Sequence, residues 1–173
     1  MLGGARSGKS ALAVRLAREA GRPVTFVATA RPSDEEMAAR IARHRADRPS
    51  GWTTVEEPVA LERAVREAPT GAALVVDCLS LWVANLFEAG RDEAAIEEEA
   101  LAAAAAAAAR TAPTYAVSNE VGLGIVPVVA LARRYRDVLG RVNAAWAAAA
   151  DETALVVAGK VLPLMPAESL LHE

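Results

Sequence analysis

The sequence predicts an α/β domain with a mostly parallel sheet, and one such domain over residues 1–173. Apolar, β-branched runs of strand length alternate with helical segments along the whole chain, which is the order that builds parallel strands with crossover helices. A glycine-rich loop stands directly before the first helix. No internal repeat and no linker-like stretch divides the sequence.

The first element is the loop GGARSGKS at residues 3–10, which matches the phosphate-binding pattern GxxxxGK[ST]. Its glycines let backbone N–H groups surround a polyphosphate, Lys9 adds a positive charge, and the Ser10 hydroxyl is a candidate Mg²⁺ ligand. The helix-forming residues 11–20 follow, so the positive end of a helix dipole faces the same anion. The alternative is an ordinary glycine-rich turn. Only Met1 and Leu2 precede the loop, where a strand is expected, so we predict a truncated first strand.

The other elements follow from hydrophobic periodicity. In the first half we predict a strand at 23–30, a helix that ends near 47, a strand at 52–56, a helix at 61–67 and a strand at 72–77. Ser33 or Asp34 can cap the helix that ends near 47. In the second half we predict helices at 79–87, 93–110 and 128–150, where Gly140 can interrupt the last, and strands at 114–118 and 153–158. Residues 159–173 are expected to be irregular.

The composition narrows the classes of function. Charged residues make up 24% of the chain and the net charge is −3, so no basic excess supports nucleic-acid binding. The single cysteine, Cys78, excludes an internal disulfide and a cysteine-based zinc cluster, and a lone thiol suits a reducing compartment. Neither a signal peptide nor an apolar run of membrane-spanning length is apparent, so we expect a cytoplasmic protein.

A carboxylate ends the strand at 72–77. The carboxyl ends of parallel strands form the ligand crevice of such sheets, and Asp77 stands at that end. This place suits an acidic residue that holds Mg²⁺, directly or through water, beside Ser10. The alternative is that Asp77 only caps the following helix. Glu56 also follows a strand, and the sequence leaves it equally open to a place in the crevice or on the surface.

The helix that ends near 47 carries a histidine on its apolar face. At about 100° per residue, Met37, Ile41 and His44 fall within one narrow sector, with arginines beside it. One interpretation is a histidine that is hydrogen-bonded at a packed interface. The other is a nucleophile, whose neutral imidazole attacks phosphorus while nearby guanidinium groups neutralise the phosphate.

Five segments carry a resemblance to a known family: GGARSGKS, EMAARIARHRADRPSGWTTVEEP, VVDCLSLWVANL, SNEVGLGIVP and RYRDVLGRVNAAWAAAADE. In this order the chain resembles the bifunctional adenosylcobinamide kinase / adenosylcobinamide-phosphate guanylyltransferase of cobalamin biosynthesis. The resemblance implies a RecA-like P-loop fold with three layers, assembled as a homotrimer. It also implies that ATP or GTP phosphorylates adenosylcobinamide. GMP then passes from GTP to adenosylcobinamide phosphate through a guanylylated His44, which gives adenosylcobinamide-GDP.

The resemblance also implies a set of site residues. His44 and Lys9 are the catalytic residues, with Ser10 and Asp77 as the predicted metal ligands. The positions predicted to bind the nucleotide are Gly3, Gly4, Ala5, Arg6, Ser7, Gly8, Lys9, Ser10, Thr29, Ala30, Arg45, Ala46, Asp47, Arg48, Glu56 and Asp77. Two features depart from the family pattern: the short segment ahead of the loop, and a tail that differs from residue 159 onward and is longer than usual.

Two other functions stay open beside the bifunctional enzyme. One is a different small-molecule P-loop kinase that forms no covalent intermediate. The other is a nucleotide-binding subunit without catalytic activity. A histidine-bound nucleotide would distinguish the first from the bifunctional enzyme, and turnover of adenosylcobinamide would distinguish the second.

Overall fold

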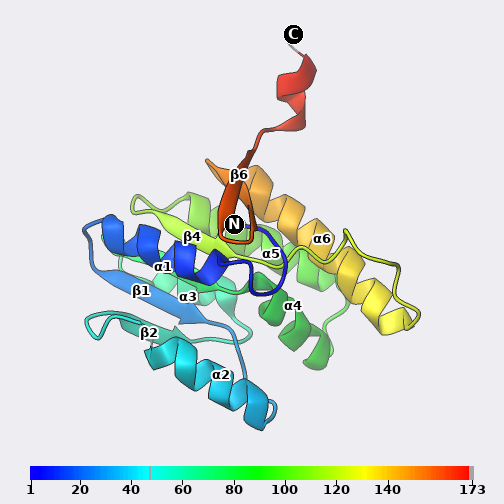
Figure 1. The fold of residues 1–173 in the computed structure, drawn as a ribbon, viewed down its shortest axis with the longest axis horizontal. Helices are drawn as coiled ribbons and strands as arrows, with labels where there is room; N and C mark the ends of the chain where they lie inside the picture. The colour runs from blue at the N-terminus through cyan, green and yellow to red at the C-terminus, as the bar shows by residue number, and fades with distance from the viewer. Residues whose placement is uncertain (47, 172–173) are drawn as a thin grey trace.

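A computed structural model describes residues 1–46 and 48–171 of the chain. Asp47, one of the predicted nucleotide contacts, lies outside the described residues. Four parallel strands form the main sheet in the order β2-β1-β3-β4 (Figure 1). Their bounds are Val24–Ala28 for β1, Thr53–Glu56 for β2, Ala73–Asp77 for β3 and Thr114–Val117 for β4. A hairpin of β5 (Thr153–Val157) and β6 (Lys160–Leu164) is antiparallel.

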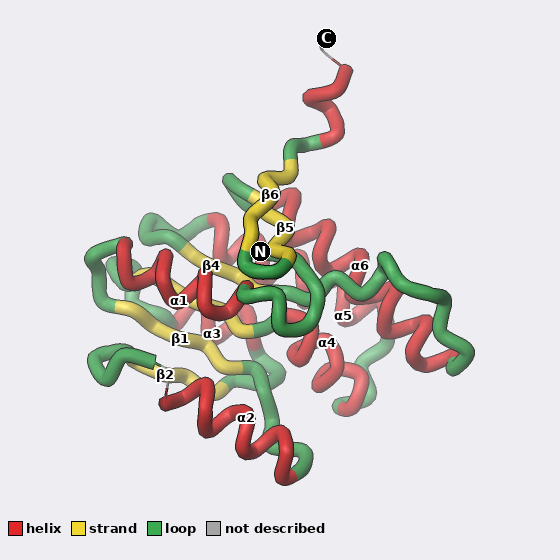
Figure 2. The backbone as a smooth tube through the Cα atoms, viewed as in Figure 1, coloured by secondary structure: helices red, strands yellow, loops and turns green. Residues whose placement is uncertain are grey.

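Helices cover both faces of the sheet, so the three-layer α/β prediction is confirmed (Figures 1 and 2). α1 (Lys9–Glu19) packs on one face, against Phe26 and Val75. α3 (Leu61–Glu67), α4 (Leu79–Glu88), α5 (Glu93–Ala108) and α6 (Ala130–Ala149) pack on the other face, against Val27 and Val76. Neighbouring residues of one strand thus serve opposite layers, as the alternation of side chains along a strand requires. α2 (Glu35–Ala46) lies beside the edge strand β2.

The tail differs from its prediction. Residues 160–164 form β6 and residues 167–171 form a short 3-10 helix, so the expectation of an irregular segment is wrong. The physical reason is a tight turn: Ala158 and Gly159 have φ values of 49° and 74°, which reverse the chain and pair Val157 with Lys160. α6 also runs through Gly140 without a break.

The two residues ahead of the loop take the place of a strand between β4 and β5. The Met1 ammonium donates to the Ala116 carbonyl at 2.8 Å, and the Leu2 N–H donates to the Ala154 carbonyl at 2.8 Å. Each residue also accepts a bond from the same strand two positions further on. This is the pattern of parallel pairing, so a very short first strand joins the four-stranded sheet to the hairpin.

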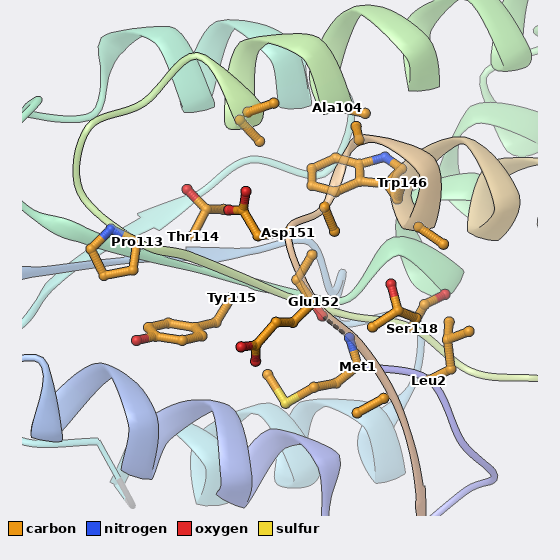
Figure 3. Close-up of a pocket in the computed structure, with 18 of the residues that line it drawn as sticks. Met1, Leu2, Ala104, Pro113, Thr114, Tyr115, Ser118, Trp146, Asp151 and Glu152 are labelled. Carbon is orange, nitrogen blue, oxygen red and sulfur yellow. Dashed lines mark hydrogen bonds between the residues drawn. The ribbon is translucent and has the colours of Figure 1, made fainter. Parts of the chain in front are cut away.

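A cleft of about 780 Å³ lies between β4 and β5, beyond Met1 and next to the short first strand (Figure 3). Alanines of α5 and α6 line one side, and Tyr115 and Trp146 also contribute to the wall. Burial lowers the pKa of the Met1 ammonium, and the charge of Lys9 lowers it further. The short first strand therefore has a cleft beside it and a buried ammonium at Met1.

Arg110 fastens the end of α5 to the turn between α3 and β3. Its guanidinium donates to the carbonyls of Val65, Ala68, Pro69 and Ala72 at 3.2, 3.0, 3.0 and 2.7 Å. Hydrogen bonds from charged groups are the stronger kind, and a lost donor leaves several carbonyls without a partner. We expect Arg110→Met, which keeps the apolar stem, to lower the free energy of unfolding by about 2–3 kcal/mol in urea titrations.

The matched control is Arg66→Met. Arg66 makes an exposed ion pair with Glu62 one helical turn away, at 2.8 Å. Exposed pairs of this kind contribute about 0.5 kcal/mol or less. Equal effects of the two substitutions would contradict a fastening role for Arg110.

Candidate functional site

The phosphate loop connects the short first strand to α1. Gly3 has φ 149° and Gly8 has φ 100°, which are conformations that favour glycine. A Cβ atom on Gly3 would also collide with the carbonyl oxygen of Val156 in β5. Gly4, Ala5 and Arg6 are exposed at the tip of the loop. The glycine positions of the motif are thus required by the backbone path and by the contact with the hairpin.

Lys9 lies inside the loop. The residue is only 5% exposed, and its Nζ donates to the carbonyls of Gly3 and Gly4 at 2.8 and 2.7 Å and to the Ser7 hydroxyl at 3.3 Å. The ammonium is therefore held at the centre of the curve that the loop describes. Ser10 follows in the first turn of α1 and is half-buried. This arrangement places one positive charge and the start of a helix at the same point, as anion binding requires.

The hairpin supports the loop from the other side. The Gly159 N–H, in the turn between β5 and β6, donates to the Ser7 carbonyl at 2.8 Å. The Gly159 Cα lies 3.5 Å from the place that a Cβ atom on Gly8 would occupy. The turn between β5 and β6 thus contacts the loop that the motif predicts.

Thr29 joins the ends of β1 and β3. Its side chain is fully buried, and Oγ1 both donates to the Cys78 carbonyl and accepts from the Cys78 N–H, each at 2.8 Å. Its own N–H donates to the Asp77 carbonyl at 3.1 Å. The Thr29 hydroxyl is therefore engaged by backbone, and it fixes the segment that carries Asp77. Burial, and then the charge of Asp77, raise the pKa of the Cys78 thiol, which favours the less reactive protonated form.

Arg48 lies against β1 and β2, within reach of the charge of Asp77. Its guanidinium carbon is 3.8 Å from the centre of the Phe26 ring in β1. Burial lowers the pKa of Arg48, and the charge of Asp77 opposes this shift. The guanidinium also donates to the Thr54 hydroxyl at 3.4 Å. Arg48 thus brings a positive charge that Asp77 influences to the face of β1 and β2.

α2 presents His44 next to an ion pair. Asp34 caps the helix by accepting from the Met37 N–H at 2.7 Å, so Asp34 is the residue that caps it. Met37, Ile41 and His44 are all half-buried, which confirms their common face. Arg45 forms an ion pair with Glu56 at the end of β2. Among the described residues, no hydrogen bond or ion pair of His44 is found.

Two polar side chains of α4 were not predicted from the sequence. Asn85 and Ser80 are 6% and 1% exposed. Asn85 donates to backbone carbonyls beyond β1 and β2, and the Ser80 hydroxyl accepts from the Asn119 amide at 3.1 Å. The sequence did contain a sign of these bonds, because a polar residue within an apolar helix needs a hydrogen-bond partner when it is buried. Asn119 itself, at the end of β4, is thereby tied to the start of α4.

The donor set suits Mg²⁺ better than a tightly chelated metal. In the described part of the chain, no group of three or more histidine, cysteine, aspartate or glutamate residues is placed to hold a metal ion. Mg²⁺ keeps several waters and takes one or two protein oxygens together with phosphate oxygens. The Ser10 hydroxyl and the Asp77 carboxylate supply oxygens of that kind.

None of the helices within 1–46 and 48–171 has the length and apolar character to cross a bilayer.

Comparison with known proteins agrees with this geometry. Residues 1–164 match the family model described as cobinamide kinase / cobinamide phosphate guanyltransferase. The chain is 46% identical over 165 residues to the bifunctional adenosylcobalamin biosynthesis protein CobP of Pseudomonas aeruginosa, with 95% of each chain covered. It is 41% identical over 170 residues to CobU of Escherichia coli and to CobU of Salmonella typhimurium, each covering 91% of this chain and 93% of the relative. The chain therefore belongs to the cobinamide kinase / cobinamide phosphate guanyltransferase family.

Proposed function

We propose that this enzyme uses ATP or GTP to phosphorylate adenosylcobinamide and then transfers GMP from GTP to adenosylcobinamide phosphate through His44. The observation that carries the second step is the half-buried His44, without a partner among the described residues, beside the Arg45–Glu56 ion pair. The phosphate loop and Asp77 are the groups that we assign to the first step, the phosphorylation of adenosylcobinamide. Membership of the family supports both activities.

Transfer of GMP takes two displacements at phosphorus. A neutral imidazole nitrogen of His44 attacks the α-phosphorus of GTP, an N–P bond forms, and the bond to the leaving pyrophosphate breaks. A phosphate oxygen of adenosylcobinamide phosphate then attacks the same phosphorus. The N–P bond breaks, His44 is released, and adenosylcobinamide-GDP is formed. In this proposal Arg45 and Arg48 neutralise phosphate charge during both displacements.

Phosphorylation needs mainly positioning and charge. The hydroxyl oxygen of the aminopropanol group attacks the γ-phosphorus, an O–P bond forms, the hydroxyl proton passes to solvent, and the bond to the leaving nucleoside diphosphate breaks. Lys9 and the N–H groups at the start of α1 stabilise the charge on the phosphoryl oxygens. Mg²⁺, held by Ser10 and Asp77, would supply further neutralisation of the phosphates.

The experiment is incubation with GTP that carries a radioactive α-phosphate. We expect an acid-labile label on the protein, lost in His44→Ala and kept in Arg43→Ala, which changes an exposed residue of the same helix. Absence of label together with intact kinase turnover would instead favour a kinase without a covalent intermediate. Thermal stabilisation by nucleotide without turnover of adenosylcobinamide would favour a non-catalytic subunit.

The proposed assembly is a homotrimer in the cytoplasm. The loop after β4 and the start of α6 expose large apolar side chains, with Leu123 83%, Ile125 98% and Val128 93% exposed. Apolar groups gathered in this way are typical of surfaces that are covered in an assembly. Analytical ultracentrifugation tests the trimer: a species with the mass of one chain at micromolar concentration would exclude it.

A further inference from the structure

We propose that Asn85 of α4 is a positioning residue, which sets the separation between the exits of β1 and β2 and so aligns the guanylyl-transfer half of the site. This inference rests on the proposed function. It concerns a side chain that lies behind the crevice and acts through the backbone of residues that approach the nucleotide. Its effect is therefore expected to differ between the two activities.

The two N–H groups of the buried Asn85 amide donate to two different segments of the chain. Asn85 is 6% exposed, and Nδ2 donates to the Thr29 carbonyl at 2.7 Å and to the Pro58 carbonyl at 3.0 Å. Thr29 directly follows β1, and Pro58 lies two residues beyond Glu56, the last residue of β2. A single planar group thus fixes how far apart the two segments lie.

Other bonds also hold the two segments. One segment is joined to the exit of β3, and the other is held mostly within itself and by α3 and α4. In the second segment, the Glu57 carboxylate accepts from Val59, Ala60 and Arg63. On the β1 side, Thr29 has further bonds to the backbone of Asp77 and Cys78. On the β2 side, the Trp82 indole N–H, one turn earlier on α4, donates to the Val59 carbonyl at 2.7 Å. The Glu57 N–H also donates to the Ala28 carbonyl at 3.0 Å.

Loss of the Asn85 amide therefore releases the β2 exit more than the β1 exit. The β2 exit carries Glu56, whose ion pair with Arg45 ties β2 to α2, the helix that carries His44. The β1 exit is joined to Asp77, beside the phosphate loop. A displacement of the β2 exit would misplace the histidine relative to the α-phosphorus while the kinase groups stay in place. Small misplacements of this kind lower rates strongly because reaction needs aligned groups.

The test compares Asn85→Leu with Asn143→Leu. Both substitutions replace a buried asparagine by leucine, which has a similar volume and no amide. Asn143 lies on α6, is 5% exposed and donates to the Asn119 carbonyl at 3.0 Å. Two rates are measured on the same preparation: single-turnover labelling of His44 from α-labelled GTP, and phosphorylation of adenosylcobinamide at saturating ATP. For Asn85→Leu we expect the labelling rate to fall at least about tenfold more than the kinase rate. For Asn143→Leu we expect no such preference.

The outcomes separate the inference from the function on which it rests. Equal losses of both activities in Asn85→Leu, with label on the wild-type protein, would overturn the positioning role alone. A wild-type protein that takes no label would overturn both. If Asn85→Leu does not fold, Trp82→Phe removes the bond to the Val59 carbonyl together with part of a buried ring, and it should shift the ratio of the two rates in the same direction. An unchanged ratio in that variant would also overturn the positioning role.

Discussion

Lys9→Ala is expected to lower the kcat of the kinase reaction by at least about 100-fold, the loss typical of one removed charge-stabilising donor. Lys9 is the one residue of the loop whose side chain brings a positive charge to the centre of its curve. In the nucleotide complex we expect this ammonium to exchange the Gly3 and Gly4 carbonyls for β- and γ-phosphate oxygens. Steady-state kinetics with adenosylcobinamide and ATP measure the loss.

The control for Lys9 is Arg15→Ala. Arg15 is exposed on the same helix, so its substitution removes the same formal charge outside the loop. Thermal denaturation of both variants without nucleotide separates a folding defect from a catalytic one. A kinase rate within threefold of the wild type in a folded Lys9→Ala protein would contradict the role of the loop.

An extension of four apolar residues, Met-Ile-Leu-Val, joined ahead of Met1 is expected to raise the melting temperature by about 5–10 °C. Burial of a large apolar side chain stabilises by about 1.5–3 kcal/mol, and for a chain of this size each kcal/mol corresponds to about 2–4 °C. The extension would run into the cleft between β4 and β5, where Figure 3 shows Met1 near its wall.

The strands on either side determine which groups the extension would meet. Because Met1 bonds to Ala116 and Leu2 to Ala154, alternation turns the N–H groups of both alanines toward the cleft. The first added residue would pair with β5 and the second with β4. Extension also replaces the buried ammonium near Lys9 by a neutral amide, which removes a charge that burial disfavours.

A Met-Gly-Ser-Gly extension of the same length is the control, because it has the backbone but no apolar side chains. Calorimetry gives the melting temperatures, and hydrogen exchange reports protection of the Ala116 and Ala154 amides. Equal melting temperatures of the two extended proteins, with both amides unprotected, would show that the cleft accepts no strand.

Local patterns were sufficient for most of the elements and for the residues that lie at strand ends. The apolar run before Asp77 predicts both a buried strand and a carboxylate at its carboxyl end, and the structure has both. The helical spacing of Met37, Ile41 and His44 likewise predicts the face that they share. These features depend on neighbours within a few residues, so the hydrophobic periodicity of the sequence predicts them.

Features that depend on distant partners were not predicted. The bonds of Thr29 to Cys78 span 49 residues, and the bond of Asn85 to Thr29 spans 56. β6 pairs with a strand whose own position depends on Met1–Leu2, and its sequence contains a proline that argued against a strand. No local pattern specifies which backbone groups a buried amide or hydroxyl will meet after folding.

The contact between Gly159 and Ser7 has a consequence for the synthesis of the protein. The loop near the start of the chain is braced by a turn near its end, through the bond at 2.8 Å from the Gly159 N–H to the Ser7 carbonyl. A ribosome delivers these residues in order, so the phosphate loop emerges first and receives this support last. A nascent chain cut short before the final hairpin would hold the complete motif without its brace. Nucleotide should therefore protect the full-length chain from proteolysis far better than chains released at residue 150.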